Sequence, residues 1–195
     1  KGNIVTTYYY STSCGKTTTM KAWGTSENES NGYLQSVEVK DKNGDYEKLL
    51  PWYRWEADID QDILSALLAE NVKKNIGTVQ SLEVTKTGPG GVALQIKAVG
   101  DKGSITVDTE NKIRKALGGN GYEIKKQDGT VAQSGTLLPS AFFKVKKAGN
   151  IFKITGGGYG HGIGMSQNGA NEMAKTGKNY QEILQMFYPG TTIEK

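Results

Sequence analysis

The sequence predicts an α+β protein with a mixed, mostly antiparallel sheet, short helices and a glycine-rich active-site loop. Three observations support this prediction. Short β-prone segments recur along the chain, several segments have the apolar spacing of helices, and 26 of the 195 residues are glycine. Such a high glycine content indicates many tight turns. Because a hydrophobic content of 36% over this length can bury a core, we expect one globular domain over residues 1–195.

The first predicted elements are a strand and a loop. β-branched and aromatic residues favour a strand over residues 3–10, and the polar run over residues 11–16 favours a loop after it. Apolar and polar side chains then alternate over residues 52–59, which predicts a half-buried strand. Trp55 is expected on its buried face and Glu56 on its polar face.

Two helices are predicted in the middle of the chain. Asp60 or Asp62 can cap the first, whose apolar residues recur with a period of 3.6. The second runs to residue 117 and is expected to be capped by Thr109 or Asp108. The apolar stripe of the first helix consists of Ile63, Leu64, Leu67, Leu68 and Val72.

Strands are predicted for most of the remaining central region. Three of them, separated by Gly-Pro-Gly-Gly and Asp-Lys-Gly turns, are expected to form a meander, and three more follow the second helix. Their ranges are 81–87, 92–99, 104–107, 122–126, 141–146 and 151–154. Residues 64–148 are a candidate inserted subdomain.

A run of glycines precedes the last two predicted helices. Residues 156–164 have the sequence GGGYGHGIG, and glycine is costly in a helix or strand, so this segment is expected to form a shaped loop. A short helix around residues 170–174 should end at Gly177. Another over residues 180–187 should stop before Pro189.

Composition excludes several classes of function. The net charge of +4 is spread along the chain without a long basic block, so nucleic acid is not an expected partner. Cys14 is the only cysteine, which excludes an internal disulfide and a cysteine-rich zinc cluster. No stretch reaches the roughly 20 apolar residues of a membrane span. The chain opens on Lys1 inside a β-prone segment, so the first element looks cut from something longer.

The glycine-rich loop is open to two interpretations. It resembles a phosphate cradle only weakly, because no Gly-Lys-Ser/Thr ending follows and the next helix is not part of a βαβ unit. Alternatively, the glycines let the backbone approach an extended ligand. In that case His161, Ser166 and Gln167 supply donors and acceptors, and the aromatic faces that sugars require come from Tyr159, Trp23 and Trp52.

Two further candidates concern catalysis. Cys14 and His161 are each unique in the chain and could form a thiolate-imidazolium pair, although nothing in the sequence shows that they are close. Glu56, beside Trp55, is the one carboxyl group with an obvious aromatic neighbour, as a glycosidase-type acid requires. Its place on the polar face of its strand favours a solvated or ion-paired carboxylate instead.

Several long motifs resemble the SpoIID/LytB family, which comprises stage II sporulation protein D and amidase enhancers. One is GYGHGIGMSQNGA over residues 158–170, and another is YSTSCGKT over residues 10–17. Weaker landmarks between them follow in the same order, so the resemblance covers nearly the whole chain. It implies that residues 1–195 are a domain of this family without its amino-terminal part.

The resemblance implies a lytic transglycosylase that acts on peptidoglycan glycan strands during spore formation. In such a reaction one glutamate protonates the glycosidic oxygen and helps the muramyl 6-hydroxyl to close a 1,6-anhydro ring. In the family this glutamate lies upstream of the serine-rich loop, and no residue here matches it. The chain is therefore expected to be inactive alone. Zinc occurs in some full-length relatives, through residues that are also upstream, so no cofactor or metal ligand is assigned here.

Residues of the two loops are expected by motif position to contact the glycan. These substrate-binding residues are Ser11, Ser13, Cys14, Tyr159, His161, Ser166 and Gln167. The expected partners are glycan strands and other wall hydrolases, at an extracytoplasmic location facing the wall. A membrane anchor in the full-length protein is left open by the resemblance. The alternative is a non-catalytic wall-binding or amidase-enhancing module of the LytB type, and a third hypothesis is a Cys14-dependent hydrolase.

Overall fold

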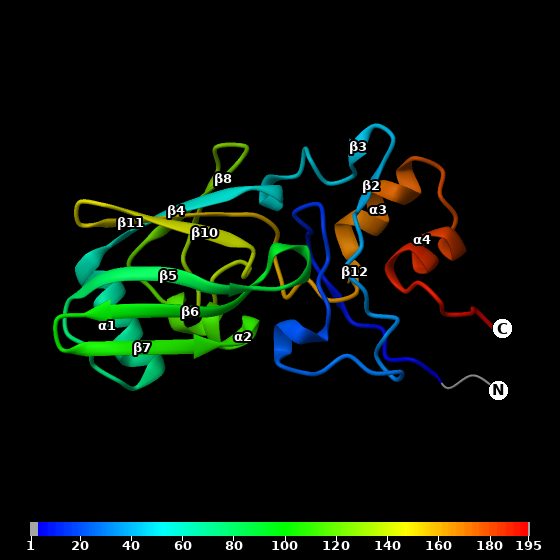
Figure 1. Cartoon of the computed structure of the whole chain (residues 1–195). Coiled ribbons are helices and arrows are strands. Elements are labelled where there is room, and N and C mark those ends of the chain that lie inside the picture. Colours follow the sequence, from blue (N-terminus) through cyan, green and yellow to red (C-terminus); the bar gives the residue numbers. More distant parts are fainter. Residues whose placement is uncertain (1–3, 195) are drawn as a thin grey trace.

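The computed structural model describes residues 4–194 and has the predicted α+β architecture. Two antiparallel sheets contain most of the strands. The larger has the order β10–β11–β4–β8–β9, and the smaller has the order β5–β6–β7. Their strands are β4 (Trp55–Asp60), β5 (Val79–Thr87), β6 (Ala93–Gly100), β7 (Gly103–Asp108), β8 (Glu123–Lys126), β9 (Val131–Gln133), β10 (Phe143–Ala148) and β11 (Ile151–Gly156). Figure 1 shows both sheets on the left and both termini on the right.

Two helices complete the sheet-containing part. Helix α1 (Gln61–Val72) follows β4, and α2 (Glu110–Leu117) follows β7. The helices contact each other, α2 also contacts β6, and β10 contacts β5, so the two sheets share one core. Side chains from both sheets and both helices are fully buried there, among them Ile59, Leu64, Leu68, Ile96, Ile113, Phe152 and Ile154. Such burial is the main source of stability for a domain of this size.

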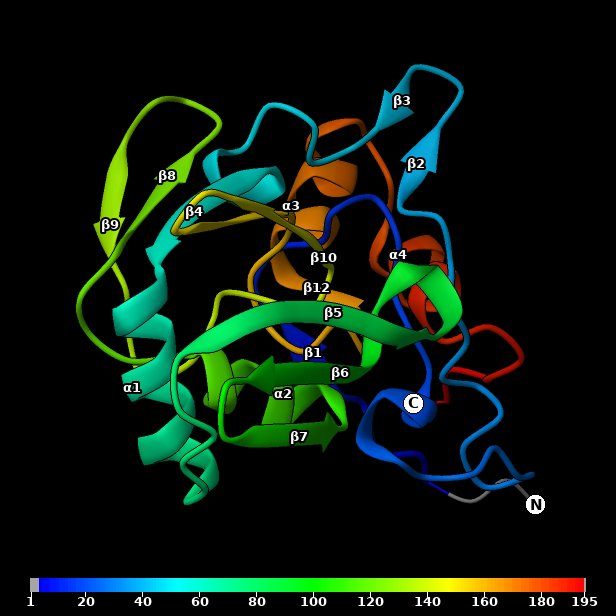
Figure 2. The same ribbon diagram turned by 60° about the vertical axis from the view of Figure 1, so that its left-hand side comes forward.

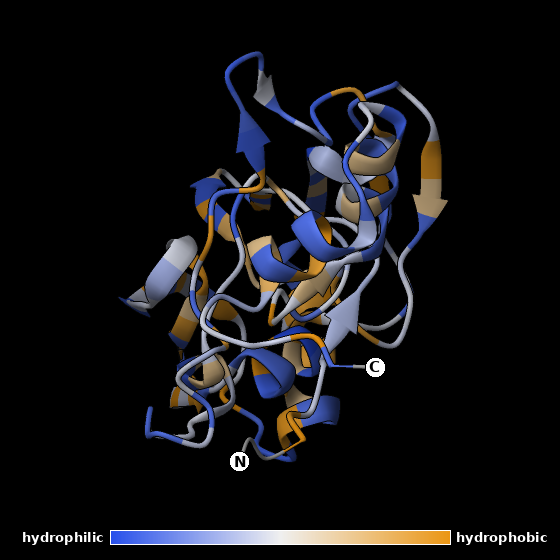
Figure 3. Ribbon diagram, turned by 90° about the vertical axis from the view of Figure 1, so that its right-hand side faces the viewer, coloured by the Kyte–Doolittle hydropathy of each residue, from blue (hydrophilic) through white to orange (hydrophobic). Residues whose placement is uncertain are grey.

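Segments from both ends of the chain form the other part. Strand β1 (Tyr9–Tyr10) pairs in parallel with β12 (Met165–Ser166), and β12 leads into α3 (Gln167–Lys175) and then α4 (Tyr180–Phe187). A small hairpin of β2 (Lys40–Asp41) and β3 (Gly44–Asp45) lies beside them. This hairpin and the β8–β9 hairpin both project at the top of Figure 2. Helices on the side that carries the termini mix hydrophilic and hydrophobic residues (Figure 3).

The alternating burial predicted for residues 52–59 is confirmed, but the strand begins later, at Trp55. Burial alternates along β4, with Trp55, Ala57 and Ile59 inside and Asp58 exposed. Residues Pro51–Tyr53 form a short 3-10 helix, η2, which ends one residue before β4, and Pro51 fits the first turn of a helix. Asp60 caps α1 by accepting a hydrogen bond of 2.8 Å from the backbone of Asp62.

Two predictions about local structure are wrong in detail. The first strand covers only Tyr9–Tyr10, because only these residues pair with β12, and predicted residue 3 lies outside the described residues. Thr109 precedes α2 but makes no side-chain cap; its backbone has a positive φ of 73°. Residue Glu110 instead interacts with Arg114 one turn later, at 2.8 Å.

The predicted subdomain at residues 64–148 stays a prediction. Strands β4 and β11 lie outside that range, yet they are the central neighbours in the five-stranded sheet.

In the part of the chain that is described, no helix is long and apolar enough to cross a membrane.

Candidate functional site

The two loops that contain the predicted site residues lie side by side, although about 150 residues separate them in the sequence. Thr12 and Tyr159 exchange two backbone hydrogen bonds, of 3.1 and 2.8 Å. The backbone of Asn168 donates to the carbonyl of Ser11 at 3.0 Å, and its side chain donates to Thr12 Oγ1 at 2.9 Å. The first loop is thus fixed to both the glycine-rich loop and the start of α3.

Glycines of the second loop pack against the chain itself. At Gly164, where φ is 76°, a Cβ would lie 2.1 Å from the carbonyl oxygen of Tyr8. At Gly158, with φ of 81°, it would lie 2.9 Å from the carbonyl oxygen of Thr12. Both positions require glycine for conformation and for space. The close approach that was expected for a ligand is made here by the protein's own amino-terminal segment.

A buried carboxylate joins the two loops. Glu47, with none of its surface exposed, accepts a hydrogen bond of 2.9 Å from the backbone N–H of Ser13. The Ser13 hydroxyl donates to its other oxygen, and the Ser166 hydroxyl donates to Oε1 at 2.6 Å. Ser166 also caps α3 by accepting a hydrogen bond from Gly169 at 3.2 Å. Ser13 and Ser166 therefore have partners inside the protein.

Sequence reasoning did not find Glu47. It lies in a polar segment with several charged neighbours, which is typical of an exposed loop, so no pattern in the sequence marks it as buried. Burial raises the pKa of Glu47 above its usual value, and the hydrogen bonds from Ser13 and Ser166 oppose this rise. Next to this cluster, the buried Tyr10 hydroxyl has no hydrogen-bond partner among the described residues.

His161 has both ring nitrogens engaged. Nδ1 accepts a hydrogen bond of 3.1 Å from the backbone of Ile163, so the proton resides on Nε2, which donates to the carbonyl of Tyr9 at 3.0 Å. The rings of Trp23 and Tyr10 lie 5.0 and 5.5 Å away. Burial lowers the pKa of His161 to about 4. The imidazole is therefore neutral near pH 7 and holds the glycine-rich loop against the first strand.

Among the described residues, no hydrogen bond joins the Cys14 thiol to the His161 ring. The Cys14 side chain lies next to Gly157, and its carbonyl accepts a hydrogen bond of 3.0 Å from Arg54. Burial raises the pKa of the Cys14 thiol, whereas the positive charge of Arg54 lowers it; the net change is upward. A protonated thiol is a poor nucleophile, which disfavours the hypothesis of a Cys14-dependent hydrolase.

Two aromatic side chains meet at the surface of the joined loops. The ring centroids of Trp52 and Tyr159 are 4.7 Å apart, and Lys126 lies 5.1 Å from the centroid of Trp52. Tyr159 is 43% exposed. Trp23, the third aromatic residue considered for a ligand, instead packs against Tyr8 and donates to Glu110 at 3.1 Å. Of these three, only Tyr159 is exposed, because Trp52 and Trp23 are both partly buried against the core.

A cleft of about 630 Å³ opens where the two loops meet the sheets. The first loop contributes Cys14, Gly15 and Lys16 to its wall, and the second contributes Gly156 and Gly157. The rest of the lining includes the charged side chains Glu38, Lys40, Asp45, Arg54 and Lys144 and the aromatic side chains Phe142 and Phe143. We call this space the interloop cleft. A larger hollow of about 720 Å³ lies beside the terminal segments, and none of the predicted site residues lines it.

Carboxyl groups near the site are engaged elsewhere. Glu56 is half-exposed and lies 3.8 Å from Lys125, as expected for the polar face of β4. Glu110 is buried and paired with Arg114 and Trp23. No group of three or more His, Cys, Asp or Glu side chains among residues 4–194 is arranged to hold a metal ion.

The structure therefore divides the predicted site residues into three groups. Ser13, Ser166 and His161 are used in internal hydrogen bonds, and Ser11 bonds its neighbour Thr12 at 3.1 Å. Cys14 lines the interloop cleft. Tyr159 and Gln167 are exposed and remain accessible to a ligand.

Comparisons with known proteins agree with the motifs. The family model "Domain of unknown function (DUF8618)" matches residues 21–164. The chain is 50% identical over 58 residues to the amidase enhancer of Bacillus subtilis, which covers 30% of this chain and 8% of that protein. It is 39% identical over 93 residues to stage II sporulation protein D of the same organism, covering 48% of this chain and 26% of the relative.

A third match has no described function. An uncharacterized protein of Brachyspira hyodysenteriae is 41% identical over 95 residues, which cover 48% of this chain and 26% of that protein. The matches thus span about a quarter or less of the length of these relatives. They confirm the resemblance as partial homology to stage II sporulation protein D and the amidase enhancer.

Proposed function

Since this chain belongs to the family of the domain of unknown function DUF8618 and is partly homologous to two cell-wall proteins of sporulating bacteria, we propose that it binds peptidoglycan glycan strands. In this proposal it is the substrate-binding part of a lytic transglycosylase of spore formation. Its location is then extracytoplasmic, where that substrate is found.

The aromatic pair formed by Trp52 and the exposed Tyr159 is the observation that carries the proposal. Sugar rings stack their C–H faces on aromatic side chains, and the exposed Tyr159, packed against the partly buried Trp52, presents such a face where the two loops join. Gln167, in the same motif as Tyr159, is also exposed. The internal hydrogen bonds of Glu47 and His161 fix the loops beneath this surface, so binding does not require them to become ordered.

The acid of the reaction is proposed to come from a residue outside this chain. Glu47 is fully buried, Glu110 is buried in an ion pair, and Glu56 is ion-paired at the surface. None of the three combines exposure with the apolar surroundings that keep a catalytic carboxyl group protonated. The chain is accordingly proposed to supply the substrate surface and not the proton donor.

Binding and cleavage can be measured separately. The 195-residue chain is mixed with purified, peptide-stripped glycan strands, and bound protein is measured by co-sedimentation while soluble products are analysed by mass spectrometry. We expect binding without 1,6-anhydro products. Release of such products would show that the chain contains its own acid, and failure to bind would refute the proposed function.

The amidase-enhancing alternative is favoured by one observation, the 50% identity to the amidase enhancer over 58 residues. Its test is to add the chain to a purified wall amidase acting on intact cell walls. An increased hydrolysis rate that persists after Tyr159→Ala would favour this alternative. If addition of the chain does not change the amidase rate, glycan binding as part of a transglycosylase is favoured.

A further inference from the structure

The interloop cleft carries an excess of positive charge. Four cationic side chains line it, Lys16, Lys40, Arg54 and Lys144, together with two carboxylates. Both carboxylates already have partners. Glu38 lies 3.5 Å from Lys16 and 2.5 Å from Lys40, and Asp45 accepts a hydrogen bond of 2.5 Å from the Tyr53 hydroxyl. Arg54 and Lys144 have no carboxylate within ion-pair distance among residues 4–194.

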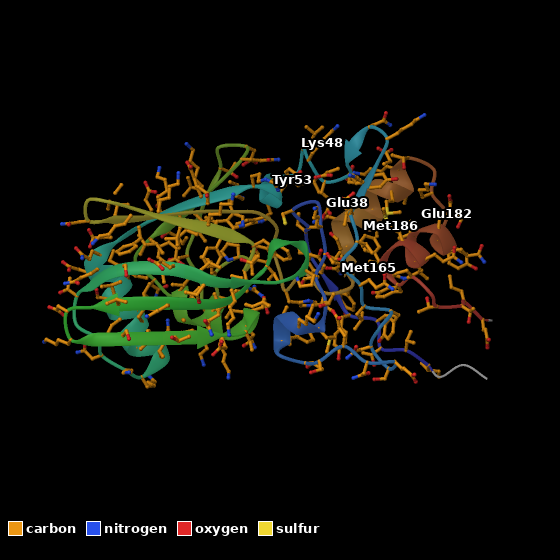
Figure 4. The ribbon with its side chains drawn as sticks, viewed as in Figure 1. Glu38, Lys48, Tyr53, Met165, Glu182 and Met186 are labelled. Atoms are coloured by element: carbon orange, nitrogen blue, oxygen red, sulfur yellow. The ribbon has the colours of Figure 1, made fainter. Side chains whose placement is uncertain are left out.

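Arg54 is held in one orientation. Its Nη1 donates to the carbonyls of Cys14 and Tyr53, at 3.0 and 2.7 Å, and Nη2 donates to the Tyr53 hydroxyl at 3.2 Å. The guanidinium carbon also lies 3.9 Å from the centroid of the Tyr53 ring. Figure 4 shows Tyr53 at the junction between β4 and the segments next to the termini. A surface arginine with three hydrogen bonds and a stacked ring has lost much of its rotational freedom before any ligand arrives.

The unused donors of Arg54 form a fork. A guanidinium has five N–H groups, and the hydrogen bonds above use both on Nη1 and one on Nη2. Nε–H and the second Nη2–H have no acceptor among the described residues. Two adjacent donors of this kind match the two oxygens of a carboxylate. Lys144 lines the same cleft from β10 and adds a second positive charge.

We propose that the interloop cleft is an anion subsite in which Arg54, assisted by Lys144, binds a carboxylate carried by the glycan strand. This inference rests on the proposed function and names the charged group that the strand presents to the cleft. Muramic acid residues carry such a carboxylate, and neutral N-acetylglucosamine oligomers do not. The cleft volume of about 630 Å³ is ample for one substituted sugar.

The test compares two ligands that differ only in charge. Peptide-stripped glycan strands are used either with free carboxylates or with the carboxylates converted to methyl esters, and affinities are measured by calorimetry at low ionic strength. We expect the wild-type chain to prefer the charged strands. Arg54→Gln should reduce this preference about tenfold, and Lys144→Gln about two- to threefold, because the first removes a forked, charge-assisted contact and the second a point charge.

Matched controls keep the result interpretable. Lys97→Gln removes one positive charge from an exposed position on β6, outside the cleft, and should leave the preference unchanged. The Lys144 side chain makes no hydrogen bond among the described residues, so its variant tests the cleft even if Arg54→Gln disturbs the Cys14 loop. Inorganic phosphate, as a competing anion, should lower the affinity for the charged strands and leave that for the esterified strands unchanged.

Each outcome has one meaning. A reduced preference in both cleft variants but not in Lys97→Gln supports the subsite. Equal affinity of the wild-type chain for charged and esterified strands overturns it while leaving glycan binding intact. A preference that survives unchanged in both cleft variants also overturns it. If neither strand binds, the proposed function fails and the subsite with it.

Discussion

The Ser166 hydroxyl donates a hydrogen bond of 2.6 Å to the carboxylate of Glu47, a residue 119 positions earlier in the chain. The same carboxylate also accepts hydrogen bonds from the backbone N–H and the hydroxyl of Ser13. One buried side chain thus connects the serine-rich loop, the glycine-rich loop and the first turn of α3. The two motifs with the clearest family resemblance depend on it for their relative position.

Glu47→Ala is expected to destabilise the fold by about 2–4 kcal/mol, because it leaves buried donors of Ser13 and Ser166 without an acceptor. Glu47→Gln keeps one acceptor oxygen and should cost less. Chemical denaturation with fluorescence detection measures both. Glu123→Ala, at an exposed position on β8, is the control and should change stability by less than about 0.5 kcal/mol. A Glu47→Ala protein as stable as this control would show that the hydrogen bonds of Glu47 to Ser13 and Ser166 do not stabilise the fold.

His161 should make stability depend on pH below neutrality. Its pKa is about 4 in the folded state, against 6.5 for an unperturbed histidine, so the unfolded chain binds the proton more tightly. The stability that neutral, buried His161 contributes is fully present above pH 6.5. It is lost as the pH falls toward 4, and the free energy of unfolding drops by up to about 2–3 kcal/mol. Unfolding free energies across this range, compared with those of His161→Gln, isolate the effect because His161 is the only histidine.

If His161 only contacted the glycan, as the motif suggests, His161→Ala would weaken glycan binding with little change in melting temperature. The two ring hydrogen bonds now favour a lower melting temperature. Thermal unfolding and glycan co-sedimentation on the same sample decide between the two roles. If His161→Ala has normal stability but no longer binds glycan, His161 is a ligand-binding residue.

Gly164→Ala should be far more damaging than Gly177→Ala. Both glycines have positive φ, of 76° and 92°, so both substitutions carry the same kind of backbone strain. Only at Gly164 would the new methyl group meet another atom, the Tyr8 carbonyl oxygen at 2.1 Å, whereas nothing lies within 4 Å at Gly177. We expect a difference of at least about 2 kcal/mol in unfolding free energy. Equal losses would mean that the loop can move away from the first strand.

Tyr159→Ala should lower the affinity for glycan strands about tenfold with only a small loss of stability, since it removes a stacking face at the surface. Tyr180→Ala is the matched control, because Tyr180 is 55% exposed and Tyr159 is 43% exposed. Co-sedimentation with purified strands measures both. Equal effects of the two substitutions would argue against an aromatic platform at Trp52 and Tyr159.

Much of the local structure was predictable. The last helix, residues 180–187, agrees with the prediction at both ends, and the three-stranded meander agrees within a few residues. Strand β9 was missed because it is short and its Val131 is 52% exposed, so it lacks the alternating apolar pattern of a half-buried strand. The first strand was predicted too long because β propensity does not reveal where a pairing partner ends.

The sequence by itself determined the fold class, the helices and the two loops that carry the family resemblance, since these depend on periodicity, turn residues and glycine content within short windows. Only the tertiary structure decided which polar groups of those loops are free for a ligand. Ser13, Ser166 and His161 are used internally, and Glu47 and Arg54 come into the site from outside the motifs. Hydrogen bonds and burial join residues that are far apart in the chain, and local sequence patterns contain no record of such pairings.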